Sequence, residues 1–497
     1  MLMSILNVTL TLVAAVLIFC IGYVRWIYGY WQRRNVVAVS ATFPFGSLTH
    51  LFTKKRYIGD IYEDDYNYIK SKNVRFGGVY VFTSPALMLV DLDLIKDVTT
   101  KSFYQFNDRG FYCNEKHDPL SAHLLNLTGE KWKKMRSKLT CAFTPAKIKM
   151  MFNTITACCE PLLNALEKYA DDCAVLDADE VMARFTTDVI GSCAFGIECN
   201  SFKGSTSEFR KYGDEVMRPS MFKVVLLALG EMNKKLGNRL GITRTTPQAR
   251  KFFLDIVSGT IAYRKKHKVA RNDFMQILID LNEFTLCEMA AQVLLFFVAG
   301  FETSASTLTF CLYELAKHPE IQKRLRNEIT EVLGEHQNIS FEAVNDMPYL
   351  CQVIDETLRK YPPAGIVARM CIKDYRVPNS DLVVKVGTKV LIPIQGLHRD
   401  PKYYPQPDVF DPERFNDENR KKIKPFTYLP FGEGPRSCLG AKFATAQAKI
   451  ALVTMLNKFQ FSLNAKTPAV LKGYYGTISL TFPKSVWLDV KKLEISV

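Results

Sequence analysis

The chain has 497 residues, of which 48% are hydrophobic and 23% are charged. A disordered chain would be poorer in apolar residues, so the composition indicates a folded protein. The formal net charge of +15 indicates either an anionic partner or a well-solvated basic surface. The 13 cysteines include no C-x-x-C pair. That argues against zinc ribbons, thioredoxin-like pairs and a disulfide scaffold, and predicts reduced thiols in a cytosolic environment.

An almost unbroken apolar run extends from Ile5 to Val24. Twenty helical residues span roughly 30 Å, the thickness of a bilayer core. No basic residue precedes the run, and it is followed by arginines and by aromatic residues that suit a membrane interface: Arg25, Trp26, Tyr28, Tyr30, Trp31, Arg33 and Arg34. The pattern predicts an uncleaved membrane anchor over residues 1–34, with the rest of the chain in the cytoplasm. The alternative is a hydrophobic pre-sequence that is removed.

Residues 35–497 are predicted to form one domain. In chain order, the apolar and turn patterns predict a hairpin over 76–92, mainly helix over 121–334 with a long helix over 288–316, a helix over 347–360, strands within 375–394, an irregular stretch over 398–430 and a last helix beginning near Cys438. The order is mainly α with small β-sheets. Because strands and helices do not alternate, a Rossmann or P-loop architecture is not expected.

The segment Phe431-Gly432-Glu433-Gly434-Pro435-Arg436-Ser437-Cys438-Leu439-Gly440 places a single cysteine between glycines, where a loop runs into a helix. Backbone N–H groups at a helix start stabilise a thiolate, and glycines let the backbone approach a flat group closely. A nucleotide-binding loop is the rival interpretation, but it would need glycine at Ser437. A buried, inert cysteine is the other alternative.

The pattern F-x-x-G-x-R-x-C-x-G resembles the cytochromes P450, which are haem-thiolate monooxygenases, and further motifs extend the resemblance over nearly the whole chain. It implies the cytochrome P450 fold, mainly α with small β-sheets, preceded here by one N-terminal transmembrane helix. It also implies haem b as cofactor, with Cys438 as the axial ligand of the iron. Phe431 and Gly440 belong to the same cofactor-binding loop.

Glu356 and Arg359 match the E-x-x-R motif of this family, and their spacing places them on one face of a helix. Arg414, in the segment Pro412-Glu413-Arg414-Phe415, is expected to complete a buried structural network. Taken alone, E-x-x-R describes many surface pairs that contribute little.

Ala299-Gly300-Phe301-Glu302-Thr303-Ser304 resembles the oxygen-activating segment of the family. The resemblance assigns catalytic roles to Thr303, as a hydrogen-bond donor, and to Glu302, as a proton relay from solvent. The alternative is a helix bend in which Thr303 bonds back to a carbonyl.

Trp132 and Arg136 share a helix face and resemble the W-x-x-x-R pair that binds a haem propionate. By the same resemblance Arg369, Arg436 and Arg109 are further propionate-binding candidates.

The family also implies electrons from NADPH delivered by NADPH–cytochrome P450 reductase, with cytochrome b5 as an additional candidate partner. The predicted docking residues for this acidic partner are Lys134, Lys138, Arg420, Lys421, Lys422, Lys424 and Lys442. Solvated lysines are the alternative. A nucleic-acid partner is not expected, because basic and aromatic residues do not cluster together.

Asp108-Arg109-Gly110 through Ser121-Ala122-His123 resembles the insect microsomal P450s that handle xenobiotics, which implies the endoplasmic reticulum membrane.

Two departures from the family pattern stand out. Residues 35–43 hold no proline, which predicts a soft linker, and the connection over 281–288 is short. The residues expected to line the substrate pocket are apolar or aromatic and predict a lipophilic substrate: Phe111, Tyr112, Leu295, Val298, Ala299, Ala364 and Tyr475. A haem-thiolate isomerase or dehydratase and a non-catalytic carrier of haem or lipophiles are the rival functions.

Overall fold

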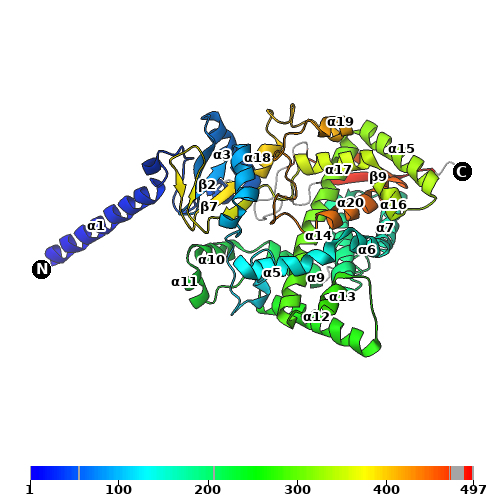
Figure 1. Cartoon of the computed structure of the whole chain (residues 1–497), viewed down its shortest axis with the longest axis horizontal. Helices are drawn as coiled ribbons and strands as arrows, with labels where there is room; N and C mark the ends of the chain where they lie inside the picture. The colour runs from blue at the N-terminus through cyan, green and yellow to red at the C-terminus, as the bar shows by residue number, and fades with distance from the viewer. Residues whose placement is uncertain (1, 54–55, 205–207, 469–470, 472–485, 495–497) are drawn as a thin grey trace.

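The computed structural model describes residues 2–53, 56–204, 208–468, 471 and 486–494. Figure 1 shows a mainly helical body, a small sheet at one end of it and an N-terminal helix that projects away. The helices of the first half are α1 (Leu2–Tyr28), α2 (Thr49–Thr53), α3 (Ile58–Ser71), α4 (Leu92–Lys96), α5 (Gly129–Thr140), α6 (Pro145–Ala157), α7 (Cys159–Asp171), α8 (Ala178–Ile190), α9 (Glu208–Met217), α10 (Met221–Met232) and α11 (Lys234–Arg239). Those of the second half are α12 (Pro247–His267), α13 (Phe274–Leu281), α14 (Leu286–Lys317), α15 (Pro319–His336), α16 (Phe341–Asn345), α17 (Pro348–Lys360), α18 (Ile394–His398), α19 (Asp417–Arg420) and α20 (Ala441–Leu456).

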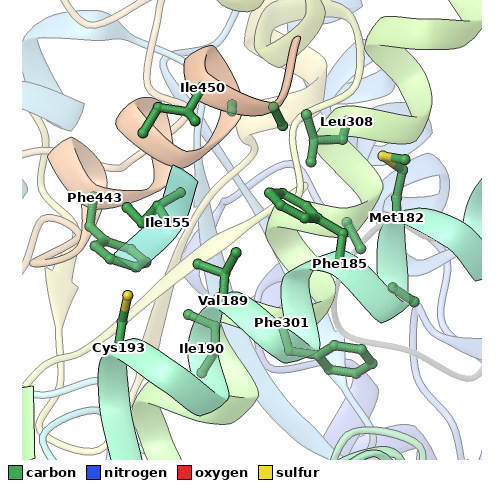
Figure 2. Close-up of a cluster of buried hydrophobic side chains, with 14 of the residues drawn as sticks. Ile155, Met182, Phe185, Val189, Ile190, Cys193, Phe301, Leu308, Phe443 and Ile450 are labelled. Carbon is green, nitrogen blue, oxygen red and sulfur yellow. The ribbon is translucent and has the colours of Figure 1, made fainter. Parts of the chain in front are cut away.

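Helix α14 runs through the middle of the helical body and is buried over most of its length. It begins with a capping box, in which Thr285 and Glu288 each bond the backbone of the other, so the short connection after α13 leads directly into a well-formed helix start. Helices α8, α17 and α20 pack against α14. Figure 2 shows this core, where Phe185 and Val189 of α8 lie among Leu308 of α14 and Ile450 of α20. The long central helix predicted from the apolar periodicity is confirmed.

A four-stranded sheet forms the β-rich end of the molecule, in the order β1 (Phe76–Val81), β2 (Ser84–Leu89), β7 (Lys389–Ile392) and β4 (Val367–Met370). The predicted hairpin is the antiparallel pair β1–β2, and β7 joins β2 in parallel. Strands β5 (Tyr375–Arg376) and β6 (Val383–Val384) pair separately. The sequence did not predict the third sheet, β3 (Leu176–Asp177), β9 (Trp487–Lys492) and β8 (Phe459–Leu463), whose strands come from distant parts of the chain.

Among the residues that the structure describes, two helices are long and apolar enough to cross a membrane. The first, over Thr9–Tyr28, is not buried at all, whereas the second is α14, which is largely buried and therefore belongs to the core. Trp31, predicted at the membrane interface, is instead 1% exposed, and its indole N–H donates to the Val79 carbonyl at 3.2 Å. The ring packs over Gly78, where a Cβ would lie 2.2 Å from it.

The linker after the anchor is fastened to the sheet. Gly78 N–H donates to the Val37 carbonyl at 2.7 Å, and Val39 N–H donates to the Gly78 carbonyl at 2.9 Å. The Tyr80 hydroxyl also donates to the Tyr28 carbonyl at 2.7 Å. The prediction of a soft linker was therefore wrong, because backbone pairing with β1 supplies the order that proline would otherwise give.

Candidate active site

The loop that carries Cys438 is a tight turn held by its own backbone. Cys438 N–H donates to the Phe431 carbonyl at 2.8 Å, and Ser437 N–H donates to the Gly434 carbonyl at 2.9 Å. Gly434 has φ +77°, and a Cβ there would lie 2.0 Å from the Thr99 carbonyl oxygen. Only glycine satisfies both the conformation and the close approach. Helix α20 then begins at Ala441, three residues after the cysteine.

Cys438 lies at the wall of a cavity of about 330 Å³, a volume typical of small-molecule sites. Burial raises the pKa of the Cys438 thiol above its ordinary value, while the Gly440 backbone N–H and the charges of Arg109 and Arg136 lower it. Without a further positive charge, the thiol form is thus favoured. Every residue predicted to bind the cofactor lines this one cavity: Arg109, Trp132, Arg136, Arg369, Phe431, Arg436, Cys438 and Gly440.

Four arginines converge on the cavity. Arg109 donates to the Arg436 carbonyl at 2.6 Å and Arg136 to the Ser437 carbonyl at 2.9 Å, so both are tied to the cysteine loop. The Arg436 guanidinium lies over the Trp132 ring at 4.1 Å. Among the described residues, the only ion pair that any of the four makes is Arg436 with Asp108, at 3.6 Å.

Apart from the Asp108 carboxylate near Arg436, no carboxylate among the described residues pairs with these guanidiniums. Burial, followed by repulsion from neighbouring arginines, lowers the pKa of Arg369 and of Arg436 to about 9, and burial lowers that of Arg109 to about 10. The Nε atoms of Arg109 and Arg369 are buried without a hydrogen-bond partner. Buried charges of this kind need an anion. The set fits a flat cofactor that carries carboxylates at one edge and accepts one thiolate ligand.

One row of α14 faces the cavity at four-residue intervals: Leu295, Ala299, Thr303 and Thr307. Residues four apart lie on one helix face, so this row could have been found from the spacing. The Thr303 hydroxyl donates to the Ala299 carbonyl, the bond expected of the helix-bend alternative, although the residue also lines the cavity.

Glu302 lies on the neighbouring row of α14 and does not line the cavity. It is 3% exposed, and its Oε1 lies 3.1 Å from Nη2 of Arg218, the residue after α9. The Arg218 side chain is 45% exposed. Glu302 is therefore connected to the surface through Arg218, a partner that the sequence did not reveal because it is 84 residues distant.

The predicted substrate residues are divided by the structure. Leu295, Ala299 and Ala364 line the cavity, whereas Phe111, Tyr112 and Val298 do not. Tyr112 is buried with Leu227 and Ile242 in a separate cluster, where its hydroxyl donates to Asn238 at 3.0 Å. Glycines of α10 and α11 make the room for its ring. Tyr475 lies outside the described residues.

Aromatic and aliphatic side chains that the sequence analysis did not single out complete the cavity wall. They come from five separate stretches of chain: Leu124, Phe143, Ile190, Cys193, Phe274 and Phe296. Each reads locally as ordinary core, so no sequence signal marked them. A second cysteine, Cys193, shares the cavity with Cys438.

The Glu356 network supports the cysteine loop from behind. Arg359 donates two hydrogen bonds to Glu356, of 2.6 and 2.8 Å, and Arg414 Nε lies 3.4 Å from the same carboxylate. Arg359 also donates to the His398 carbonyl at 3.0 Å. His398, which the sequence analysis passed over, accepts Leu429 N–H at 2.8 Å just before the cysteine loop. Burial lowers the pKa of His398 to about 3, so its ring is neutral and free to accept.

Comparison with known proteins agrees with this geometry. The cytochrome P450 family pattern matches residues 44–480. "Probable cytochrome P450 6a13" of Drosophila melanogaster is 40% identical over 495 residues, covering 96% of this chain and 99% of the relative. "Cytochrome P450 6A1" of Musca domestica is 37% identical over 487 residues, covering 95% of each. A cysteine loop, a buried E-x-x-R network and a full-length match to insect relatives thus come together in one chain, which belongs to the cytochrome P450 family and is a P450 monooxygenase of insect type.

Proposed function

We propose that this chain uses haem b, held through the Cys438 thiolate, to insert one oxygen atom of O2 into a lipophilic small molecule. The observation that carries the proposal is one cavity that has Cys438 in its wall and four arginines short of counter-charge around it. The haem iron supplies O2 binding and reduction when bound. The overall balance is one substrate C–H bond, O2, two electrons and two protons giving a hydroxylated product and water.

The chain's own residues would hold the cofactor and move protons. Arg109, Arg136, Arg369 and Arg436, with Trp132, would pair with the two propionates, which would raise the lowered pKa values of the guanidiniums back toward their ordinary value. Phe431 and Gly440 would fix the loop at the thiolate.

Thr303 would donate its hydroxyl proton toward the cavity after releasing the Ala299 carbonyl, and Glu302 would resupply that proton from the Arg218 side. The rivals, a haem-thiolate isomerase or dehydratase and a carrier, need no such supply.

Electrons would come from NADPH through NADPH–cytochrome P450 reductase, with cytochrome b5 as a second candidate donor. Seven basic residues are predicted to contact the reductase. Three of them, Lys138, Arg420 and Lys422, pair with Glu283, Asp355 and Glu418 respectively. Lys134, Lys421, Lys424 and Lys442 make no ion pair with any described residue, and they would carry the attraction.

The expected location is the endoplasmic reticulum membrane, with α1 as a single anchor and the domain, residues 35–497, facing the cytosol. The apolar wall of the cavity supports a lipophilic substrate, either a xenobiotic such as a plant toxin or insecticide, or an endogenous lipid or hormone.

The test is a carbon monoxide difference spectrum of the reduced, haem-loaded protein. The red-shifted Soret band of a thiolate-ligated haem is expected in the wild type and in Cys193→Ala, and its loss is expected in Cys438→Ala. Cys193 is the matched control because its side chain lines the same cavity. A band that survives Cys438→Ala, or no haem uptake by the wild type, would refute the proposal.

A further inference from the structure

A second cavity, of about 530 Å³, lies on the other side of the cysteine loop. Phe431, Gly432 and Ile354 line both cavities and form the wall between them. The second cavity is bounded by α17, α16, the start of α6 and the first turns of α20. Neither haem binding nor oxygen insertion accounts for it.

Lys449 of α20 lines this second cavity and is only 7% exposed. Its Nζ lies 3.3 Å from Oδ1 of Asn345, a neutral amide. Within the part of the chain that the structure describes, Lys449 forms no ion pair with a carboxylate. The charge of Lys449 also acts on the Glu328 carboxylate, but that carboxylate is already engaged by the backbone N–H groups of Tyr349 and Leu350, at 2.7 and 2.9 Å. A buried ammonium is costly unless it is paired, so Lys449 lacks a close anionic partner.

The charges at the mouth of the cavity point the same way. Arg420 and Lys442 line it and are exposed to solvent. Among the described residues that line the cavity, Asp355 is the one carboxylate, and it is already engaged by Arg420 at 2.7 Å and by the Tyr428 hydroxyl at 3.0 Å. The lining therefore offers two positive charges, those of Lys442 and Lys449, with which no carboxylate of the lining forms an ion pair.

Much of the remaining wall is apolar. Ile148, Phe341 and Ile354 contribute side chains to it from three different helices, and Phe431 contributes from the cysteine loop. A ligand that satisfies both parts of this cavity carries one anionic group and an apolar body. The volume is within the range of small-molecule sites.

We propose that this second cavity is a binding site for a small amphiphilic carboxylate, such as a medium-chain fatty acid, with its carboxylate on Lys449 and Lys442 and its hydrocarbon chain against Ile148, Ile354 and Phe341. The ligand would lie against Phe431, whose carbonyl accepts the N–H of Cys438. A ligand bound in the second cavity would therefore affect the loop that holds the cysteine.

The test is calorimetric titration of octanoate into the full-length, haem-loaded protein after a lipophilic azole has filled the first cavity. The azole blocks octanoate from binding there, and its spectral shift shows independently that haem is bound and that each variant is folded. Octan-1-ol, which has the same chain without the charge, is the ligand control. Lys449→Met is the variant, and Lys458→Met, an exposed lysine just beyond α20, is its matched control.

One equivalent of octanoate is expected to bind the wild type and Lys458→Met alike. Octan-1-ol is expected to bind at least tenfold more weakly, and Lys449→Met is expected to lose about tenfold or more in octanoate affinity, as for the loss of one charged hydrogen bond. Equal binding by Lys449→Met, equal binding of the alcohol, or no octanoate binding by the wild type would overturn the proposal. A missing azole shift would instead count against haem binding, so the two failures are distinguishable.

Discussion

Replacing Arg359 by methionine removes the centre of the buried network behind the cysteine loop while keeping a side chain of similar length. The wild-type guanidinium is fully buried and makes two hydrogen bonds to Glu356 and others to the carbonyls of His398 and Pro407. In the variant Glu356 would keep only the Asp411 N–H at 3.0 Å and the more distant Arg414. The carboxylate would remain buried without its main partner.

Breaking a buried ion pair by removing one partner costs about 3–5 kcal/mol. For a chain of this length the entropy of unfolding is about 1 kcal/mol/K, so the melting temperature should fall by about 3–5 °C. Burial already raises the pKa of Glu356, and loss of Arg359 raises it further. A carboxyl whose folded pKa is raised loses stability as pH rises, so the deficit should be larger at pH 8 than at pH 6.

The assay is scanning calorimetry of the haem-loaded protein at one fixed scan rate, because thermal unfolding of so large a chain is expected to be irreversible. Arg376→Met is the matched control, since it removes an arginine from a solvent-exposed pair with Asp381 at 3.7 Å. An exposed pair of this kind contributes at most about 1 kcal/mol. If Arg359→Met melts no lower than Arg376→Met, the network does not support the fold as argued.

Three further predictions follow from the site. Gly434→Ala should abolish the thiolate-haem band because its Cβ would overlap the Thr99 carbonyl, whereas Gly387→Ala, at a similar φ of +86° but in open space, should retain it; equal bands would refute the steric argument. His398→Gln should flatten the acid dependence of stability. The imidazole has a pKa of about 6.5 in the unfolded chain and about 3 in the folded one, so the wild-type free energy of unfolding falls as pH drops below about 6.5, by at most about 1.4 kcal/mol per pH unit. Urea titrations of both proteins at pH 7 and pH 5.5 measure this difference. Thr303→Ala should divert electrons from product to hydrogen peroxide, measured as product formed per NADPH consumed, while Thr307→Ala, one turn along the same row, should change that ratio little; equal ratios would contradict the assigned role of Thr303.

Local patterns were sufficient where neighbours in the sequence decide the structure. The apolar periodicity placed α14 to within two residues at its start and one at its end, because a buried helix must present apolar side chains all round. The hairpin β1–β2 followed from β-branched residues around glycines. The cysteine loop was recognised because its glycines, arginine and cysteine lie within ten consecutive residues.

Predictions that depended on distant contacts fared differently. Trp31 lies in a stretch of arginines and aromatic residues that is typical of a membrane interface, yet it is buried because Gly78 leaves room for its ring. Tyr112 reads as an apolar pocket residue, but α10 and α11 enclose it in a cluster of its own. In both cases a segment far along the chain decides the environment, and periodicity carries no information about that segment.

The sequence by itself determined the family and, through the motifs of that family, predicted the cysteine and the arginines that would bind a flat, anionic cofactor. Only the tertiary structure decided how they are used. It joined Glu302 to Arg218 across 84 residues, linked Arg359 through His398 to the cysteine loop, and left Lys449 buried at a second cavity. The physical reason is that burial and counter-charge are properties of a packed surrounding, which is assembled from segments that no local pattern relates to one another.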